Sequence, residues 1–91
     1  MNKILLVDDE IFNLSSLMMV LKYKLQIDVD SICVQALSGE QALEIIKKDV
    51  LENQGKDSSF KLILMDYSMP TQTGPETCIL IREFLYKNDI E

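Results

Sequence analysis

Residues 61–70 have the sequence Lys-Leu-Ile-Leu-Met-Asp-Tyr-Ser-Met-Pro, an apolar run that ends in one carboxylate and a turn-forming Met-Pro pair. Because residues 62–65 show no polar alternation, the run predicts a strand at residues 60–65 that is buried on both faces. Asp66 then lies at the carboxyl end of the strand, where open parallel sheets bind ligands. An Asp after a strand also commonly starts a turn, so Asp66 alone leaves that simpler role open.

Residues 4–7 form a second apolar run without alternation, and they are followed directly by Asp8, Asp9 and Glu10. This run predicts a central parallel strand that also ends in acid. A helix is predicted next, because apolar residues recur at helical spacing. These residues are Leu14, Leu17, Met18, Leu21 and Leu25.

Residues 26–31 predict a loop, and residues 32–37 predict a second strand, rich in β-branched residues at its start. Ser38 and Gln41 have the spacing of a capping box that begins a second helix. The polar residues 53–59 predict a loop before the strand at residues 60–65. A second capping box, Thr73 with Glu76, predicts a third helix that runs to about residue 87.

Three strand–helix pairs in succession predict an α/β domain with a parallel sheet and helices on both faces. If the strand order is 2-1-3, the carboxyl ends of the first and third strands flank the topological switch point of the sheet. Asp8 and Asp9 would then meet Asp66 in one crevice.

Length and composition limit the possible functions. Ninety-one residues make one small domain at most, and a net charge of −6 without a basic patch argues against nucleic-acid binding. The chain has no His, which excludes a Ser-His-Asp triad and argues against a zinc site. Cys33 and Cys78 lack metal-type spacing, so buried free thiols in a reducing cytoplasm are expected. No apolar run is long enough for a membrane span or a signal peptide, so no membrane contact is expected.

Three clustered carboxylates repel one another, because two like charges about 4 Å apart cost roughly 4 kcal/mol at an effective dielectric constant of 20. That is a large part of a domain stability of about 5–15 kcal/mol, so a cation or protonation must compensate. Ligands that are all oxygen favour Mg²⁺ over zinc or copper. An alternative explanation for Asp8, Asp9 and Glu10 is that acidic residues stabilise the N-terminus of the helix that follows. That explanation does not account for Asp66 after the third strand.

The pattern resembles the receiver domain of two-component response regulators. The resemblance is carried by Leu-Leu-Val-Asp-Asp-Glu at residues 5–10, by Leu-Met-Asp-Tyr-Ser-Met-Pro at residues 64–70 with Gly74, and by Ile-Arg at residues 81–82. Asn13, three residues after the acidic triplet, is similar to receiver domains attached to hybrid histidine kinases. These motifs cover most of the chain in matching order, and they imply the flavodoxin-like fold.

The resemblance also implies a role for each matching residue. Asp66 corresponds to the phosphoacceptor, which takes a phosphoryl group from a phosphohistidine. Asp9, Asp66 and the backbone carbonyl of Ser68 correspond to direct Mg²⁺ ligands, and Asp8 corresponds to an acid that holds Mg²⁺ through water. The implied partner is a sensor or hybrid histidine kinase, or a phosphotransfer protein. The chain would take part in its own phosphorylation and is not expected to be a turnover enzyme.

The resemblance covers only the first three βα units, so residues 1–91 are expected to be a partial receiver domain that lacks the fourth and fifth units. The Thr or Ser and the Lys that act on the phosphate in the family belong to the missing units. The strand at residues 60–65 would then form an open, apolar edge of the sheet. Such edges pair with other chains, so we expect self-association, exchange of elements or partial folding.

Two other functions are consistent with these acids. A non-catalytic interaction module would keep the acidic Mg²⁺ pocket without being phosphorylated. A hydrolase of the haloacid dehalogenase type would also form an aspartyl phosphate, but it needs an Asp two residues after the nucleophile. Ser68 occupies that position, which argues against the hydrolase.

Overall fold

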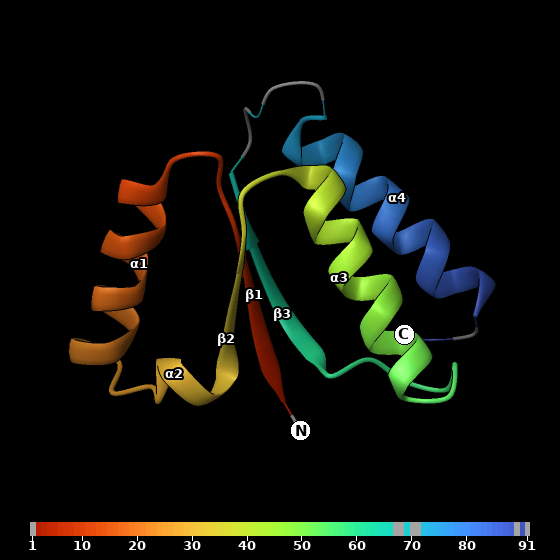
Figure 1. Ribbon diagram of the computed structural model, residues 1–91, viewed down its shortest axis with the longest axis horizontal. Helices are drawn as coiled ribbons and strands as arrows, with labels where there is room; N and C mark the ends of the chain where they lie inside the picture. Colours follow the sequence, from red (N-terminus) through yellow and green to blue (C-terminus); the bar gives the residue numbers. More distant parts are fainter. Residues whose placement is uncertain (1, 67–68, 70–71, 89, 91) are drawn as a thin grey trace.

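The computed structural model describes residues 2–66, 69, 72–88 and 90. Strands and helices alternate along this part of the chain (Figure 1). In chain order the elements are β1 (Lys3–Val7), α1 (Ile11–Tyr23), α2 (Val29–Ile32), β2 (Cys33–Ala36), α3 (Gly39–Glu52), β3 (Phe60–Met65) and α4 (Gly74–Lys87). The predicted α/β class is confirmed.

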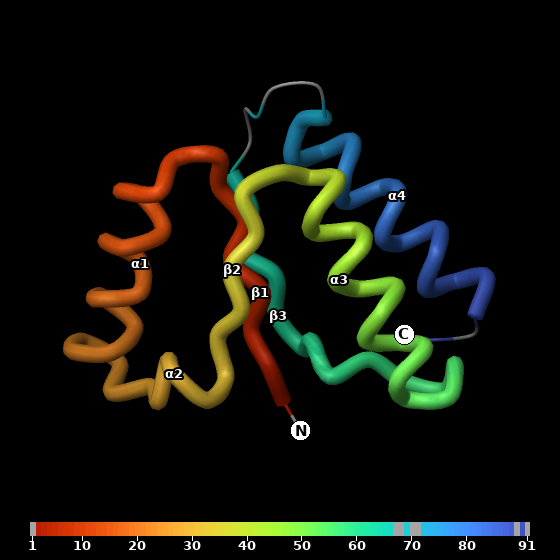
Figure 2. Tube along the Cα trace, viewed as in Figure 1, coloured from red at the N-terminus to blue at the C-terminus, as the bar shows by residue number. Residues whose placement is uncertain are grey.

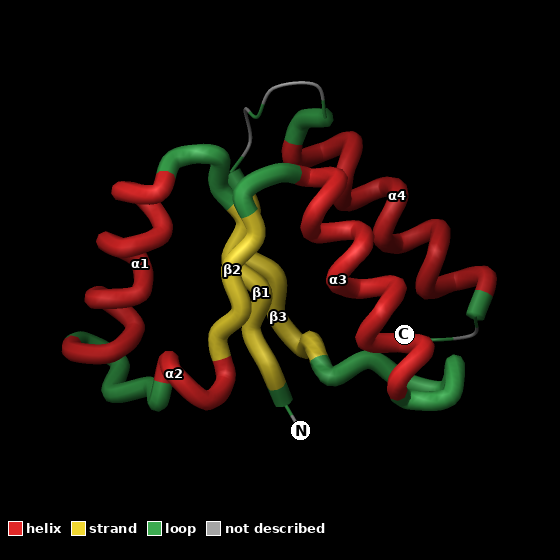
Figure 3. The backbone as a smooth tube through the Cα atoms, in the orientation of Figure 1, coloured by secondary structure: helices red, strands yellow, loops and turns green. Residues whose placement is uncertain are grey.

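The strands form a parallel sheet in the order β2-β1-β3, as predicted. The register pairs Val7 at the end of β1 with Ala36 of β2 and with Met65 of β3. All three strands therefore end at the same level. Figure 3 shows that the loops which follow β1 and β2 leave from this shared end of the sheet.

Helices cover both faces of the sheet: α1 lies on one side, and α3 and α4 lie together on the other (Figure 2). The central strand β1 supplies both cores, because successive side chains of a strand point to opposite faces. Leu5 and Val7 belong to the core under α3 and α4, whereas Leu6 packs with Leu14 and Leu21 of α1. This central position explains why residues 5–7 of β1 are almost completely buried.

The strand β3 corrects one sequence prediction. Residues 60–65 were expected to be buried on both faces, but every residue of β3 is half-buried or exposed, and Leu62 is 48% exposed. The physical reason is the position of β3 in the sheet. It pairs with β1 along one edge, and no described residue pairs with its other edge.

The segment between α1 and α3 also differs from the prediction. Residues 28–32, predicted as loop and strand, contain the short helix α2, so β2 begins at Cys33. The Ser31 hydroxyl donates to Asp28 Oδ2 at 2.9 Å, which satisfies polar groups beside this single turn. Leu25, predicted on the buried face of the first helix, follows the end of α1 and is 61% exposed. The chain leaves the helical direction there, and Gln26 has a positive φ of 55°.

Both predicted capping residues begin their helices. The Ser38 hydroxyl accepts the backbone N–H of Gln41 at the start of α3, while Gln41 Oε1 accepts the N–H of Leu37. Thr73 and Glu76 form the complete reciprocal capping box at the start of α4. Among the described residues, no helix combines the length and apolar character needed to cross a bilayer.

Candidate functional site

The backbone on both sides of the switch point is fixed by the sheet. Asp66 N–H donates to the carbonyl of Val7 at 2.9 Å, and Asp8 N–H donates to the carbonyl of Ala36 at 3.1 Å. Each acid is thus the first residue beyond its strand and is still hydrogen-bonded to the neighbouring strand. The positions of Asp8 and Asp66 are therefore set by the hydrogen bonds of the β-sheet.

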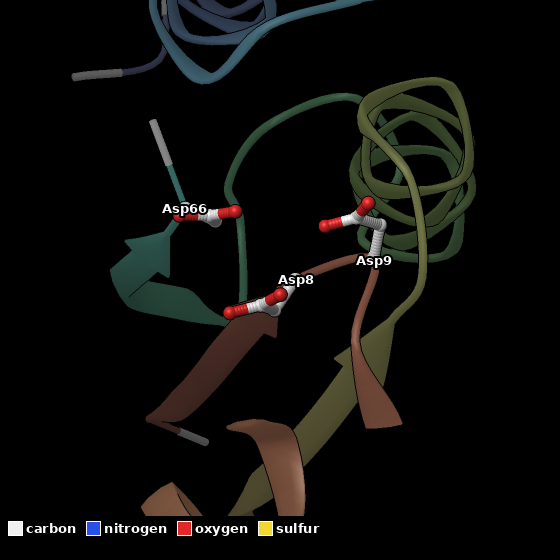
Figure 4. A group of neighbouring side chains, drawn as sticks. All are labelled: Asp8, Asp9 and Asp66. Atoms are coloured by element: carbon white, nitrogen blue, oxygen red, sulfur yellow. The ribbon is translucent and has the colours of Figure 1, made fainter. Parts of the chain in front are cut away.

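Asp8, Asp9 and Asp66 converge at this end of the sheet, as Figure 4 shows. One carboxylate oxygen from each residue lies within 4.8 Å of the others, and all three residues are half-buried. The predicted convergence of the three acids is confirmed by this arrangement. Three negative charges at such short range favour binding of a cation.

Asp8 is oriented by the start of α1. Its Oδ1 accepts the backbone N–H of Glu10 at 2.9 Å and Asn13 Nδ2 at 3.4 Å. Glu10 lies in the connection to α1, and Asn13 lies in the first turn of α1. Because both donate to the same oxygen, they fix the orientation of the Asp8 carboxylate. The contact between Asn13 and Asp8 was not predicted from the sequence. It could have been, because Asn13 lies five residues after Asp8, on the first turn of the predicted helix, where its side chain can reach back to the end of the strand.

A cleft of about 400 Å³ lies beside two of these acids. Asp8, Asn13 and Asp66 supply its polar wall, and apolar residues of β3 and α1 supply the remainder. The carboxylate of Asp66 is therefore reachable from one side.

The site fits a hard divalent cation. Mg²⁺ binds oxygen ligands at about 2.0–2.1 Å, so opposite ligands lie about 4.2 Å apart, and it usually keeps several waters. Oxygens spread over as much as 4.8 Å match a cation that some carboxylates bind directly and others bind through water. Asp8, Asp9 and Asp66 are the described residues that would hold the ion. Ser68, expected to contribute its backbone carbonyl, lies outside the described residues.

Burial raises the pKa of the Cys33 thiol. A thiol with a raised pKa stays protonated near neutral pH and is a poor nucleophile and metal ligand. Cys33 packs beside the core that includes Leu6 and Leu14. This agrees with the predicted packing role of Cys33. Both cysteines are free as expected, but Cys33 and Cys78 are half-buried and not fully buried.

A close packing contact, not predicted from the sequence, joins α3 to α4 near the same end of the sheet. Thr77 is completely buried, accepts Gln72 Nε2 at 2.9 Å and donates to the carbonyl of Thr73 at 2.8 Å. Gly39 at the start of α3 packs directly against the Thr77 hydroxyl, with no room for a Cβ. This contact fixes the segment that enters α4, which follows the loop after Asp66.

The structure is similar to a solved receiver domain. It superposes on the crystal structure of a mutant of the receiver domain of the histidine kinase CKI1 from Arabidopsis thaliana, with a TM-score of 0.75 and 26% sequence identity. The match covers 99% of this chain and 60% of that chain. No protein-family model matches the sequence, and no curated protein matches it significantly.

Sheet order, the acidic cluster and this structural match together support a receiver domain. The resemblance in the sequence is thus confirmed by the fold. Receiver domains of this kind are signalling modules of two-component and phosphorelay systems, and the similar structure is itself part of a histidine kinase. The chain spans 60% of the length of that solved receiver domain.

Proposed function

We propose that the chain is a phosphoacceptor module of two-component signalling, in which Asp66 takes a phosphoryl group from a phosphohistidine. The observation that carries this proposal is the convergence of Asp8, Asp9 and Asp66 within 4.8 Å at the shared end of β1 and β3. Residues 1–91 would correspond to the first three βα units of such a domain, which agrees with the share of the solved receiver domain that they match.

The two free cysteines are in keeping with a cytoplasmic location.

In the proposed transfer, a carboxylate oxygen of Asp66 attacks phosphorus in line with the bond to the donor. An O–P bond forms to Asp66, the N–P bond of the phosphohistidine breaks, and its electron pair leaves on the imidazole nitrogen. Asp66 can serve as nucleophile because it lies beside the cleft and its backbone is held by Val7. Asp8, Asp9 and Asp66 would hold Mg²⁺, together with the backbone carbonyl of Ser68. A bound Mg²⁺ would neutralise charge on the phosphoryl oxygens and on the clustered carboxylates.

Removing the metal is expected to stop this reaction. The intact mass of the wild-type chain would be measured after incubation with acetyl phosphate in Mg²⁺, and in parallel with excess EDTA. We expect one added phosphoryl group in Mg²⁺ and none in EDTA, because the crowded carboxylates otherwise repel the anionic donor. Mg²⁺ binding without any added phosphoryl group would instead support the non-catalytic interaction module.

The start of α1 offers a docking surface for the phosphoryl donor. Ile11 is 65% exposed and Phe12 is 85% exposed, and both directly follow the acidic residues 8–10. Exposed large apolar side chains beside a reactive site are typical of protein–protein contacts. We therefore propose that the histidine-bearing donor, a kinase or a phosphotransfer protein, packs against this part of α1.

Phe12→Ala separates docking from chemistry. Because the Phe12 side chain is almost completely exposed, its removal leaves the core intact. We expect transfer from a phosphorylated histidine phosphotransfer protein to slow by about tenfold, and transfer from acetyl phosphate to be unchanged. Tyr86→Ala, an aromatic residue of α4 that is 83% exposed, is the matched control. Equal rates for both variants with the protein donor would contradict docking at α1.

A further inference from the structure

Asn13, in the first turn of α1, is an exposed polar residue that lines the same cleft as Asp8 and Asp66. The other described residues that line this cleft are apolar. A carboxylate accepts hydrogen bonds and does not donate them, whereas a carboxamide does both. The amide of Asn13 is therefore the one side-chain donor among the described residues of the cleft.

The contact with Asp8 determines which end of the Asn13 amide lies beside the acids. Asn13 Nδ2 donates to Asp8 Oδ1 at 3.4 Å, and the same oxygen accepts the N–H of Glu10 at 2.9 Å. An amide nitrogen carries two N–H groups, and this contact uses one of them. Within the described part of the chain, no residue accepts the second N–H of Asn13.

A phosphoryl group needs donors of this kind. At Asp66 it would bring more negative charge to a site where three carboxylates already lie within 4.8 Å of one another. Mg²⁺ would neutralise part of that charge, and N–H groups that donate to the remaining phosphoryl oxygens add to the stabilisation. Because Asn13 is already bonded to Asp8, its amide is oriented before the anion arrives and needs little reorganisation to bind it.

We propose that Asn13 is a binding residue for the phosphoryl group: one N–H of its amide holds Asp8, and the other donates to a phosphoryl oxygen at Asp66. The inference rests on the proposed function, because it requires a phosphoryl group at Asp66. It goes further in assigning a donor to the anion in addition to the carboxylates that would bind the cation. Binding of the cation and binding of the anion should therefore be separable at Asn13.

Asn13→Asp is expected to separate the two kinds of binding. It keeps the size of the side chain but replaces a donor with a further carboxylate, and an acid in the first turn of a helix is compatible with folding. Mg²⁺ binding, measured by calorimetry, should be as tight as in wild type or tighter, because added negative charge favours a cation. Phosphoryl incorporation from acetyl phosphate should slow by about tenfold or more, because a hydrogen bond to a charged group is lost. Rates are compared by intact mass at Mg²⁺ concentrations that saturate each chain.

Two further variants show which property of the side chain matters. Asn13→Leu removes the donor at similar size without adding charge, so its phosphorylation should also slow by about tenfold. Asn2→Asp makes the same change from amide to carboxylate at an exposed residue just before β1, at the opposite end of the sheet. This control should keep the wild-type rate and the wild-type affinity for Mg²⁺.

Beryllium trifluoride, a stable mimic of the phosphoryl group, tests the contact without a transfer reaction. Its binding in the presence of Mg²⁺ would be followed by fluorine NMR. The mimic should bind about tenfold more weakly to Asn13→Asp and Asn13→Leu than to wild type, and equally well to Asn2→Asp. If wild type binds the mimic in this Asn13-dependent way but takes no phosphoryl group from acetyl phosphate, the proposed function fails while the contact of Asn13 stands.

Other outcomes would overturn the proposal. Wild-type rates and wild-type affinity for the mimic in the two Asn13 variants would show that the amide does not contact the anion. Weaker Mg²⁺ binding in both variants, with full rates once Mg²⁺ is saturating, would show that Asn13 acts on the metal through Asp8 alone. A wild-type chain that neither binds the mimic nor is phosphorylated would contradict both this inference and the proposed function.

Discussion

Asp66→Asn is expected to abolish phosphoryl incorporation from acetyl phosphate and from a phosphohistidine donor. Asparagine keeps the size and position of the side chain, but its amide is a far poorer nucleophile than a carboxylate. The backbone bond from residue 66 to Val7 does not depend on the side chain, so the strand end stays in place. The loss should therefore be complete, while the fold is kept.

Two controls make this result specific. Asp30→Asn removes one exposed carboxylate from α2, which precedes β2 and so lies at the opposite end of the sheet. This variant should be phosphorylated like wild type. Thermal unfolding without Mg²⁺ should show Asp66→Asn to be at least as stable as wild type, because one of three mutually repelling charges is gone. Residual phosphorylation of Asp66→Asn would show that another residue accepts the phosphoryl group.

Gly39→Ala is expected to destabilise the chain by about 1–3 kcal/mol, the usual cost of overpacking a filled site. A Cβ at residue 39 would overlap the Thr77 hydroxyl, and it would also lie 2.8 Å from Gln72 Nε2 and 3.2 Å from the Gln72 carbonyl. Elsewhere in a helix, alanine is more favourable than glycine by about 1 kcal/mol. A lower free energy of unfolding for Gly39→Ala would therefore indicate close packing, and a higher one would indicate helix propensity. Urea unfolding measures this difference.

A double-mutant cycle with Thr77→Ala supplies the control for Gly39→Ala. Thr77→Ala removes the atom with which the new methyl group collides, at the loss of the two hydrogen bonds of the Thr77 hydroxyl. Gly39→Ala should then cost less in the Thr77→Ala chain than in wild type. A Gly39→Ala variant that is as stable as wild type, or a cycle with no coupling, would contradict the close contact between α3 and α4.

The candidate site was largely predictable because it depends on topology. Parallel strands in the order β2-β1-β3 bring the ends of β1 and β3 together, so acids that directly follow two apolar runs must meet. Ser38 and Thr73 could be predicted as caps because capping is a local interaction. Local and topological patterns of this kind can be read from a single sequence.

Features set by long-range packing could not be predicted in the same way. The apolar run of β3 indicates a buried strand, yet its exposure depends on whether another strand lies beyond it. The helix α2 is a single turn, too short to show a helical period, and its Asp28 and Ser31 are typical loop residues. Gly39 meets Thr77 only because α3 and α4 pack on the same face of the sheet. No local pattern marks that contact.

The central claim is that Asp66 carries the phosphoryl group, and chemical mapping of the acceptor tests it most directly. The wild-type chain would be incubated with acetyl phosphate and Mg²⁺, reduced with borohydride and digested, and its peptides sequenced by mass spectrometry. Borohydride converts an aspartyl phosphate to homoserine, so we predict homoserine at position 66 in Mg²⁺ and aspartate there in EDTA. Homoserine at position 8 or 9, or an unmodified residue 66 in a chain that has gained a phosphoryl group, would contradict the account.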